Sequence, residues 1–345
     1  MIKFFRKIRQ RLLAENRFNK YLLYAVGEIV LVVIGILIAL QINNNNEAKN
    51  NKERFIKVLK EIRKDLETDL SKTEFLLERG REMDSLTRHV LSEKITKEQY
   101  LKKENRDLFW VGLQFTAFDY QKTAFQKFEN FNGIIPQEFD SLTNKISNYY
   151  NLVVKRYDYM YERLRQQIKD RHDYLATNHN WYYLLRKKET TEEMINFYVN
   201  NPVYKNWVSQ HSVDNTTGKY GDLKKIENDA FLLLLEINSY LKDNYKINDT
   251  YLLNKYGYSS ETSDLVGDYK DINDNLTFKL HKKGGFLFFH NDDILKYKND
   301  TLSFLKYTDM IMVVKRNTDN KVEGLKYIDF KDATRNSYAK KLKND

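Results

Sequence analysis

The longest apolar run of the chain lies between residues 21 and 42 and has no polar face. It reads YLLYAVGEIVLVVIGILIALQI, in which 14 of 22 residues are Leu, Ile or Val and Glu28 is the sole charged residue. At about 1.5 Å per residue the run spans roughly 33 Å, the thickness of a bilayer's hydrocarbon core. The aliphatic residues favour insertion by about 4 to 8 kcal/mol, and one carboxyl group costs about 3 kcal/mol. We therefore predict a transmembrane helix over residues 21–42; a core helix of this length would carry a polar face.

The charges on either side of this run predict its orientation. Residues 1–20 contain seven basic residues and one acidic residue, whereas residues 43–60 contain five basic residues and two acidic ones. The denser positive flank stays in the cytoplasm. The N-terminus is thus predicted to be cytoplasmic and the C-terminus periplasmic, with the chain in the inner membrane. A cleaved signal peptide is the alternative, but no small-x-small site follows Ala39.

Before the membrane run, residues 2–15 place Phe4, Phe5, Ile8 and Leu12 on one face of a helix and basic residues on the other. This pattern is typical of an amphipathic helix lying on the inner leaflet. A short cytoplasmic binding peptide is the alternative. Residues 1–20 are too few for a cytoplasmic enzyme domain.

Within the membrane run, Glu28, Gly35 and Ala39 fall on one stripe. Gly35 and Ala39 follow Glu28 by seven and eleven residues. At about 100° per residue, the three lie within roughly 20° of one direction around the helix. A carboxyl group beside two small residues is typical of a helix–helix contact in lipid. We expect these three residues to mediate self-association or contact with a partner helix. The alternative is that Glu28 reaches toward the inner headgroups.

Beyond the membrane run, apolar residues recur at steps of three and four, which predicts a helical bundle over residues 43–250. The first stripe runs through residues 50–91, either as a separate helix or as a continuation of the membrane helix: Phe55, Leu59, Ile62, Leu66, Leu70, Thr73 and Leu77. Further helices are predicted at 120–131, from Pro136 through residue 168, at 190–199 and at 221–244. Pro202 is expected to end the helix at 190–199.

The pattern changes near residue 264, where short runs rich in Phe, Leu, Val and Tyr alternate with turn signals. Seven strands are predicted, at about 265–270, 275–281, 284–290, 293–298, 301–307, 309–316 and 322–329. Regular short strands with tight turns favour an antiparallel meander that closes into a small barrel. We assign residues 264–330 to this β-module and residues 331–345 to a charged tail. The predicted fold class is α+β.

Two stretches resemble known families. The run YLLYAVGEIVLVVIGILIALQINN resembles the N-terminal signature of an uncharacterised family, a domain of unknown function, of single-pass membrane proteins from Gram-negative bacteria. Asn43–Asn46 lack the tryptophan expected within that signature. LVGDYKD and KVEGLKYID resemble small lipocalin-like β-modules, which are often appended to serine hydrolases and other exported bacterial proteins. The first resemblance implies topology, and the second implies fold.

Composition narrows the function classes. The net charge is +10, of which residues 1–20 supply +6, so the basicity indicates a membrane surface and no nucleic-acid partner is expected. The chain has no cysteine, which excludes disulfides and thiolate chemistry. The six histidines have no metal-binding spacing, and no cofactor motif occurs, so we expect no cofactor, no metal and no catalytic residues.

Three weaker signals remain. Ser337–Lys340 spells S-x-x-K, which we attribute to chance because it lies in the tail, outside any expected pocket. Asp292 with Asp293 does not make a calcium loop. The aromatic segment His179–Leu185, with nearby tyrosines such as Tyr149, Tyr150 and Tyr157, either lines a ligand cavity or builds a core, and helical spacing favours a core.

Three functions stay open. The first is a membrane-anchored periplasmic interaction protein, a sensor or scaffold whose partner the sequence does not identify. The second is an anchored hydrolase or ligand-binding protein without a recognisable motif. The third is a membrane component in which Glu28 couples to protons, and Glu28→Gln would separate it from the others.

Overall fold

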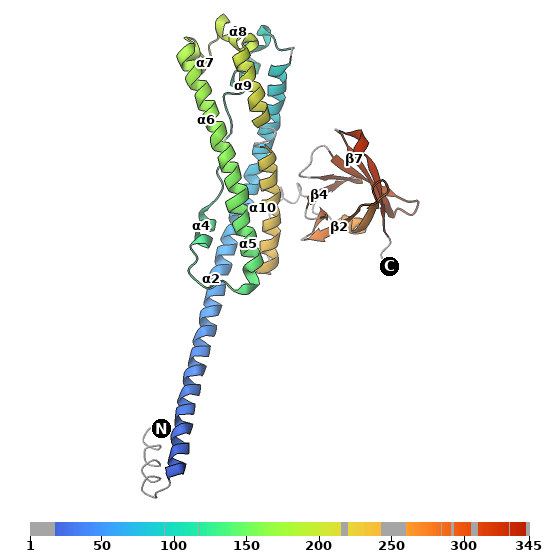
Figure 1. Cartoon of the computed structure of the whole chain (residues 1–345). Helices are drawn as coiled ribbons and strands as arrows, with labels where there is room; N and C mark the ends of the chain where they lie inside the picture. The colour runs from blue at the N-terminus through green and yellow to red at the C-terminus, as the bar shows by residue number, and fades with distance from the viewer. Residues whose placement is uncertain are drawn as a thin grey trace. The chain divides into compact units, whose positions relative to one another are not determined.

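The computed structural model describes residues 18–92, 94–116, 118–214, 220–242, 260–283, 285–290, 293–304, 310–330 and 332–342. The helix predicted at residues 2–15 lies outside them. A helical region is followed by an eight-stranded antiparallel barrel, which confirms the predicted α+β class (Figure 1). The chain divides into two compact units, one comprising Met1–Val58 and Asn130–Asp140, the other Leu59–Glu129 and Ser141–Asp345.

Helix α2 (Phe18–Leu91) is 74 residues long and contains both the predicted membrane run and the stripe that follows it. The two are therefore one continuous helix. The four asparagines Asn43–Asn46 do not interrupt it, although Asn is a weak helix former. Each costs only about 0.7 kcal/mol or less, and helix propagation is cooperative.

In the first unit, the segment Asn130–Asp140 folds against α2. The ring of Phe55 packs edge-on against Phe131 and Phe139, with centroids 5.4 and 5.2 Å away. Arg54 Nη2 donates a 2.6 Å hydrogen bond to Asn132 Oδ1. This segment includes the short helix η2 (Gln137–Phe139), which follows Pro136.

The second unit contains most of the remaining helices. They are α3 (Lys97–Leu101), η1 (Lys103–Trp110), α4 (Thr123–Glu129), α5 (Asp140–Asn148), η3 (Tyr149–Val154), α6 (Lys155–Asn178), α7 (Tyr182–Lys187), α8 (Glu192–Asn200), α9 (Pro202–Val213) and α10 (Tyr220–Leu241). The predicted stripe of α2, from Phe55 to Leu77, is buried throughout. Arg63 of α2 donates to Asn238 Oδ1 of α10 at 3.0 Å. Periodicity alone therefore identified the inward face of α2.

The long helical run from α5 to α6 departs from its predicted stripe. Tyr149, Val153 and Tyr157 were expected inward, but Val154 is buried where Val153 was expected. The reason is that η3 is a π-helical segment. A π turn accommodates one extra residue, so within it the buried position moves from Val153 to Val154. Beyond it, Tyr157, Leu164 and Ile168 are buried as predicted.

Pro202 begins a helix instead of only ending one, which corrects the expectation for this position. It occupies the first turn of α9, and Asn201 Oδ1 caps that turn by accepting the Val203 amide at 2.8 Å. Proline is well tolerated there, because the first amides of a helix have no intrahelical acceptor.

The C-terminal strands form a closed barrel in which each strand pairs with its neighbours in sequence. They are β1 (Gly267–Asp271), β2 (Thr277–Lys283), β3 (Phe286–Phe289), β4 (Asp293–Lys298), β5 (Thr301–Phe304), β6 (Met310–Arg316), β7 (Val322–Asp329) and β8 (Ser337–Lys341). The short helix η5 (Ser260–Leu265) precedes β1, and η6 (Ala333–Arg335) precedes β8. Seven strands fall where alternation predicted them.

The eighth strand corrects the predicted charged tail. Residues 337–341 form β8, which pairs with both β1 and β7 and thereby closes the barrel. Its Ala339 is buried in the interior, whereas Lys340 is exposed. The segment ends in Lys340 and Lys341, so its five residues show no clear alternation of apolar and polar positions. The sequence pattern alone is therefore typical of a solvated tail.

Candidate functional site

The residues predicted for a membrane contact all lie on α2. Glu28 is half-buried, and Gly35 and Ala39 are exposed. A Cβ added at Gly35 would meet nothing within 4 Å. The stripe has room for a second helix, and whether one docks there stays a prediction.

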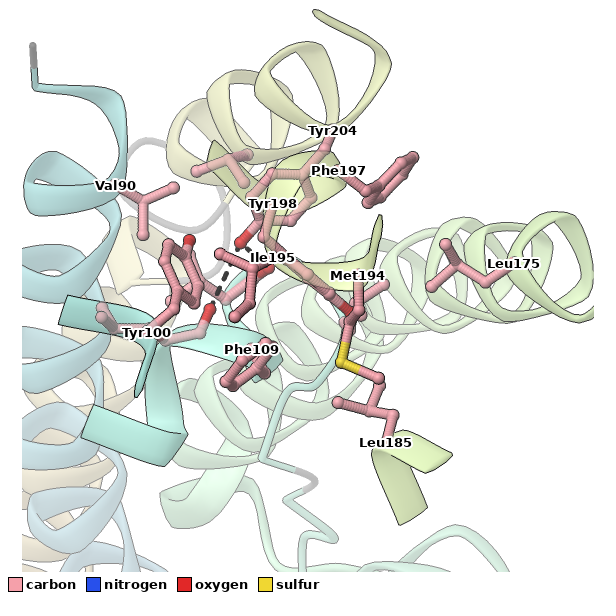
Figure 2. Packing of buried hydrophobic residues seen from close by; sticks show 14 of the residues in the cluster. Val90, Tyr100, Phe109, Leu175, Leu185, Met194, Ile195, Phe197, Tyr198 and Tyr204 are labelled. Carbon is pink, nitrogen blue, oxygen red and sulfur yellow. Dashed lines mark hydrogen bonds between the residues drawn. The ribbon is translucent and has the colours of Figure 1, made fainter. Parts of the chain in front are cut away.

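The aromatic segment around His179 belongs to a packed core. Trp181 and Leu185 are buried, and the His179 ring lies 4.6 Å from Phe197 and 4.8 Å from Trp181. Figure 2 shows the neighbouring part of the same cluster, where Tyr100, Phe109, Tyr198 and Tyr204 pack together. This segment therefore builds a core at the junction of α6, α7, α8 and α9.

The histidines of this region are packed as well. His172 Nδ1 lies 2.8 Å from the Tyr182 hydroxyl, and its Nε2 lies 2.9 Å from the Leu113 carbonyl oxygen. Burial lowers the pKa of His172, so a neutral ring fits this position. Among the residues that the structure describes, no group of three or more His, Cys, Asp or Glu side chains could hold a metal ion.

The barrel has one closed end. Leu265 of η5 is fully buried, and its carbonyl oxygen accepts a 2.7 Å hydrogen bond from the Tyr269 hydroxyl. At the same end, Arg316 pairs with Asp264, which precedes β1, and with Asp300 in the β4–β5 turn. These contacts fasten η5 across the strand ends.

The opposite end opens into a cavity of about 530 Å³. Apolar side chains of β2, β3, β5, β6, β7 and β8, and one that precedes β2, line its wall: Leu276, Phe278, Phe289, Phe304, Met310, Met312, Leu325, Tyr327 and Ala339. Polar side chains complete the described lining toward the turns and strand ends at the mouth: Asp271, Asp274, Thr277, His290, Asp293, Arg335 and Ser337. Pockets for small molecules typically measure about 300–1,000 Å³ and combine an apolar wall with a few polar groups.

The cavity follows from the geometry of the barrel. An eight-stranded barrel is just wide enough either to be filled by side chains or to hold one small ligand. At the closed end, Leu265 and Tyr269 occupy the interior. At the open end the wall includes the small Ala339 and two methionines, Met310 and Met312, whose flexible side chains adapt to varied shapes.

The S-x-x-K sequence lies in this wall but does not form a catalytic pair. Ser337 lines the cavity, whereas Lys340 is exposed. Three residues along a strand place two side chains on opposite faces. The interpretation as chance holds, but the expected location outside any pocket was wrong for Ser337.

Sequence reasoning missed this cavity. The inward residues of each strand were visible as alternation. Met310, Met312 and Val314 of β6 and Leu325 and Tyr327 of β7 do belong to the barrel core. Alternation along a strand does not show whether the barrel interior is filled. The filling depends on the combined size of the side chains that eight strands place at the same height in the barrel.

Comparison with known protein families gives a match over part of the chain. Residues 28–170 match the model of a family of unknown function, DUF6090. This agrees with the resemblance to an uncharacterised family and includes part of the membrane run. No curated protein and no solved structure matches the chain.

Proposed function

We propose that this chain is a single-pass inner-membrane protein that holds, in the periplasm, a barrel able to bind a small apolar or amphipathic molecule. It acts as a sensor or scaffold. The observation that carries the proposal is the cavity of about 530 Å³ at the open end of a closed barrel, with an apolar wall and a polar mouth. A barrel filled to both ends would leave no place for a ligand.

The membrane part of the proposal rests on α2. The apolar side chains between Leu22 and Ile42 are about half exposed or more, and the most apolar window has a mean hydropathy of 2.6. A core helix of a soluble protein would bury such residues, whereas lipid covers them without cost. The orientation follows from the denser positive charge of residues 1–20. A reporter that is active solely in the cytoplasm, fused after Asp345, should be silent; activity there would overturn the topology.

Ligand binding is tested in the full chain in its membrane. A photoreactive alkanol should label peptides that contain cavity residues such as Phe278 and Met312. Ala339→Leu adds three carbons to the cavity wall and should lower this labelling about fivefold or more, since overpacking a filled site costs about 1–3 kcal/mol.

The neighbouring residue supplies the control. Lys340→Leu places the same side chain on the outer face of β8 and should leave labelling of the cavity peptides unchanged. Strand-type circular dichroism and protease resistance should match wild type for both variants. Equal labelling of wild type and the folded Ala339→Leu variant would show that the cavity holds no ligand.

A further inference from the structure

The mouth of the cavity is acidic, although the whole chain carries a net charge of +10. Three carboxyl groups belong to the described lining at this end: Asp271 and Asp274 on the β1–β2 side, and Asp293 at the start of β4. Arg335 is the one arginine of that lining, which includes no lysine. The described lining of the mouth therefore differs in sign from the chain as a whole.

Arg335 does not neutralise these three acids, because it is paired elsewhere. Its Nε lies 3.3 Å from Asp332 Oδ2, and its Nη1 lies 3.8 Å from Asp329 Oδ2. Neither of these aspartates belongs to the described lining of the cavity. The positive charge of Arg335 is thus balanced within the β7–β8 connection.

Two of the three acids are held in place by the backbone. Asp271 Oδ1 accepts the Asn273 amide at 2.8 Å, and Asp274 Oδ1 accepts the Leu276 amide at 2.8 Å. Each bond uses one carboxylate oxygen and leaves the second for a ligand. The apolar wall begins directly behind them, at Leu276 and Phe278.

We propose that the cavity selects an amphiphile with an apolar tail and a cationic head such as an ammonium group. The tail lies against Phe278, Phe289 and Met312, and the ammonium donates hydrogen bonds to Asp271 and Asp274. An anionic head of the same length meets the same carboxylates with repulsion, so the mouth discriminates by charge. This inference rests on the proposed function, because it requires that the cavity binds a ligand at all.

The experiment uses the full chain in membranes at pH 8 with three photoreactive probes of equal chain length: an alkylamine, an alkanol and an alkanoate. A primary alkylamine is cationic at this pH and an alkanoate is anionic. Labelling of the cavity peptides is compared between wild type and Asp271→Asn/Asp274→Asn. A comparison between proteins with one probe cancels differences in partitioning into the bilayer.

The double variant should lower amine labelling about fivefold, since partly exposed ion pairs contribute about 0.2–1 kcal/mol each. Alkanoate labelling should rise and alkanol labelling should stay the same. Added salt should reduce the amine effect in wild type. Asp319→Asn, a change in the β6–β7 turn away from the mouth, is the matched control and should change nothing.

The outcomes separate the two proposals. Suppose that each of the three probes labels the double variant as strongly as wild type, while Ala339→Leu still lowers labelling by all three. The cavity then binds ligands without regard to charge, and the inference is wrong. If Ala339→Leu has no effect on any probe, the proposed function itself fails.

Discussion

Asp69 of α2 accepts the backbone amide of Gln121 with both carboxylate oxygens, at 3.1 and 3.2 Å. One turn earlier, Asp65 Oδ2 accepts the Ala124 amide at 3.2 Å. Two carboxyl groups of α2 thus satisfy one amide just before α4 and one in its first turn, where no intrahelical acceptor exists. This is how α2 positions the chain that leads into α4.

This contact predicts a pH-dependent stability. Burial raises the pKa of Asp69 to about 7, although the Gln121 amide and Lys72 lower it. Because the folded chain holds this proton more tightly than the unfolded chain, stability falls as pH rises from about 4 to about 7. The melting temperature should therefore be several degrees lower at pH 8 than at pH 5.

Asp69→Asn removes the titrating group, so the difference between pH 5 and pH 8 should shrink. Asp65→Asn is the matched control and should retain most of it. Thermal melts of the full chain in mild detergent measure both. An undiminished difference in Asp69→Asn would assign the pH dependence to other groups.

A second prediction compares two tyrosines of the aromatic cluster (Figure 2). The Tyr204 hydroxyl donates to the carbonyl oxygens of Leu108 and Val111, at 3.3 and 3.2 Å. Tyr204→Phe leaves these buried acceptors without that donor and should cost about 1–2 kcal/mol. The Tyr198 hydroxyl is buried without a hydrogen-bond partner. Tyr198→Phe should therefore be neutral or stabilising, and a loss equal to that of Tyr204→Phe would contradict the assignment.

The third prediction concerns the stripe of the membrane run. Glu28→Leu should weaken self-association of residues 1–50 severalfold, since interhelical polar bonds in membranes are worth about 0.6–2 kcal/mol. Gly35→Leu should weaken it by obstruction. Gly27→Leu is the matched control, because Gly27 lies about 100° round the helix from Glu28 and a Cβ at either glycine meets nothing within 4 Å. A bacterial dimerisation reporter measures the association of all three variants. If Glu28→Leu and Gly35→Leu associate as strongly as wild type, Glu28 reaches toward the headgroups instead.

The fourth prediction concerns barrel closure. Truncation after Asn336 removes β8, which leaves the edges of β1 and β7 unpaired and takes Ala339 out of the interior. The barrel should become sensitive to protease and lose strand signal in circular dichroism. Truncation after Leu342 keeps β8 and should behave as wild type. A barrel that resists protease without β8 would show that seven strands suffice.

The sequence by itself determined the local structure of this protein. The inward face of α2 from Phe55 to Leu77, the helix α10 and seven of the strands follow from spacing of apolar residues, because burial of one face imposes a period of 3.6 or 2. The apolar run between Tyr21 and Ile42, a candidate membrane span, is also a local property, since its length and lack of a polar face need no partner to be recognised.

The tertiary structure decided what depends on residues far apart in sequence. The π turn at Tyr149–Val154 buries Val154 where the spacing predicted Val153. Strand β8 forms because its backbone pairs with the edges of β1 and β7, although its lysines are typical of a solvated tail. The cavity exists because side chains from eight strands leave its open end unfilled, and Asp293 lines the same mouth as Asp271 and Asp274 only when the barrel closes. Each of these features depends on pairing and packing across the whole module, which no single stretch of sequence contains.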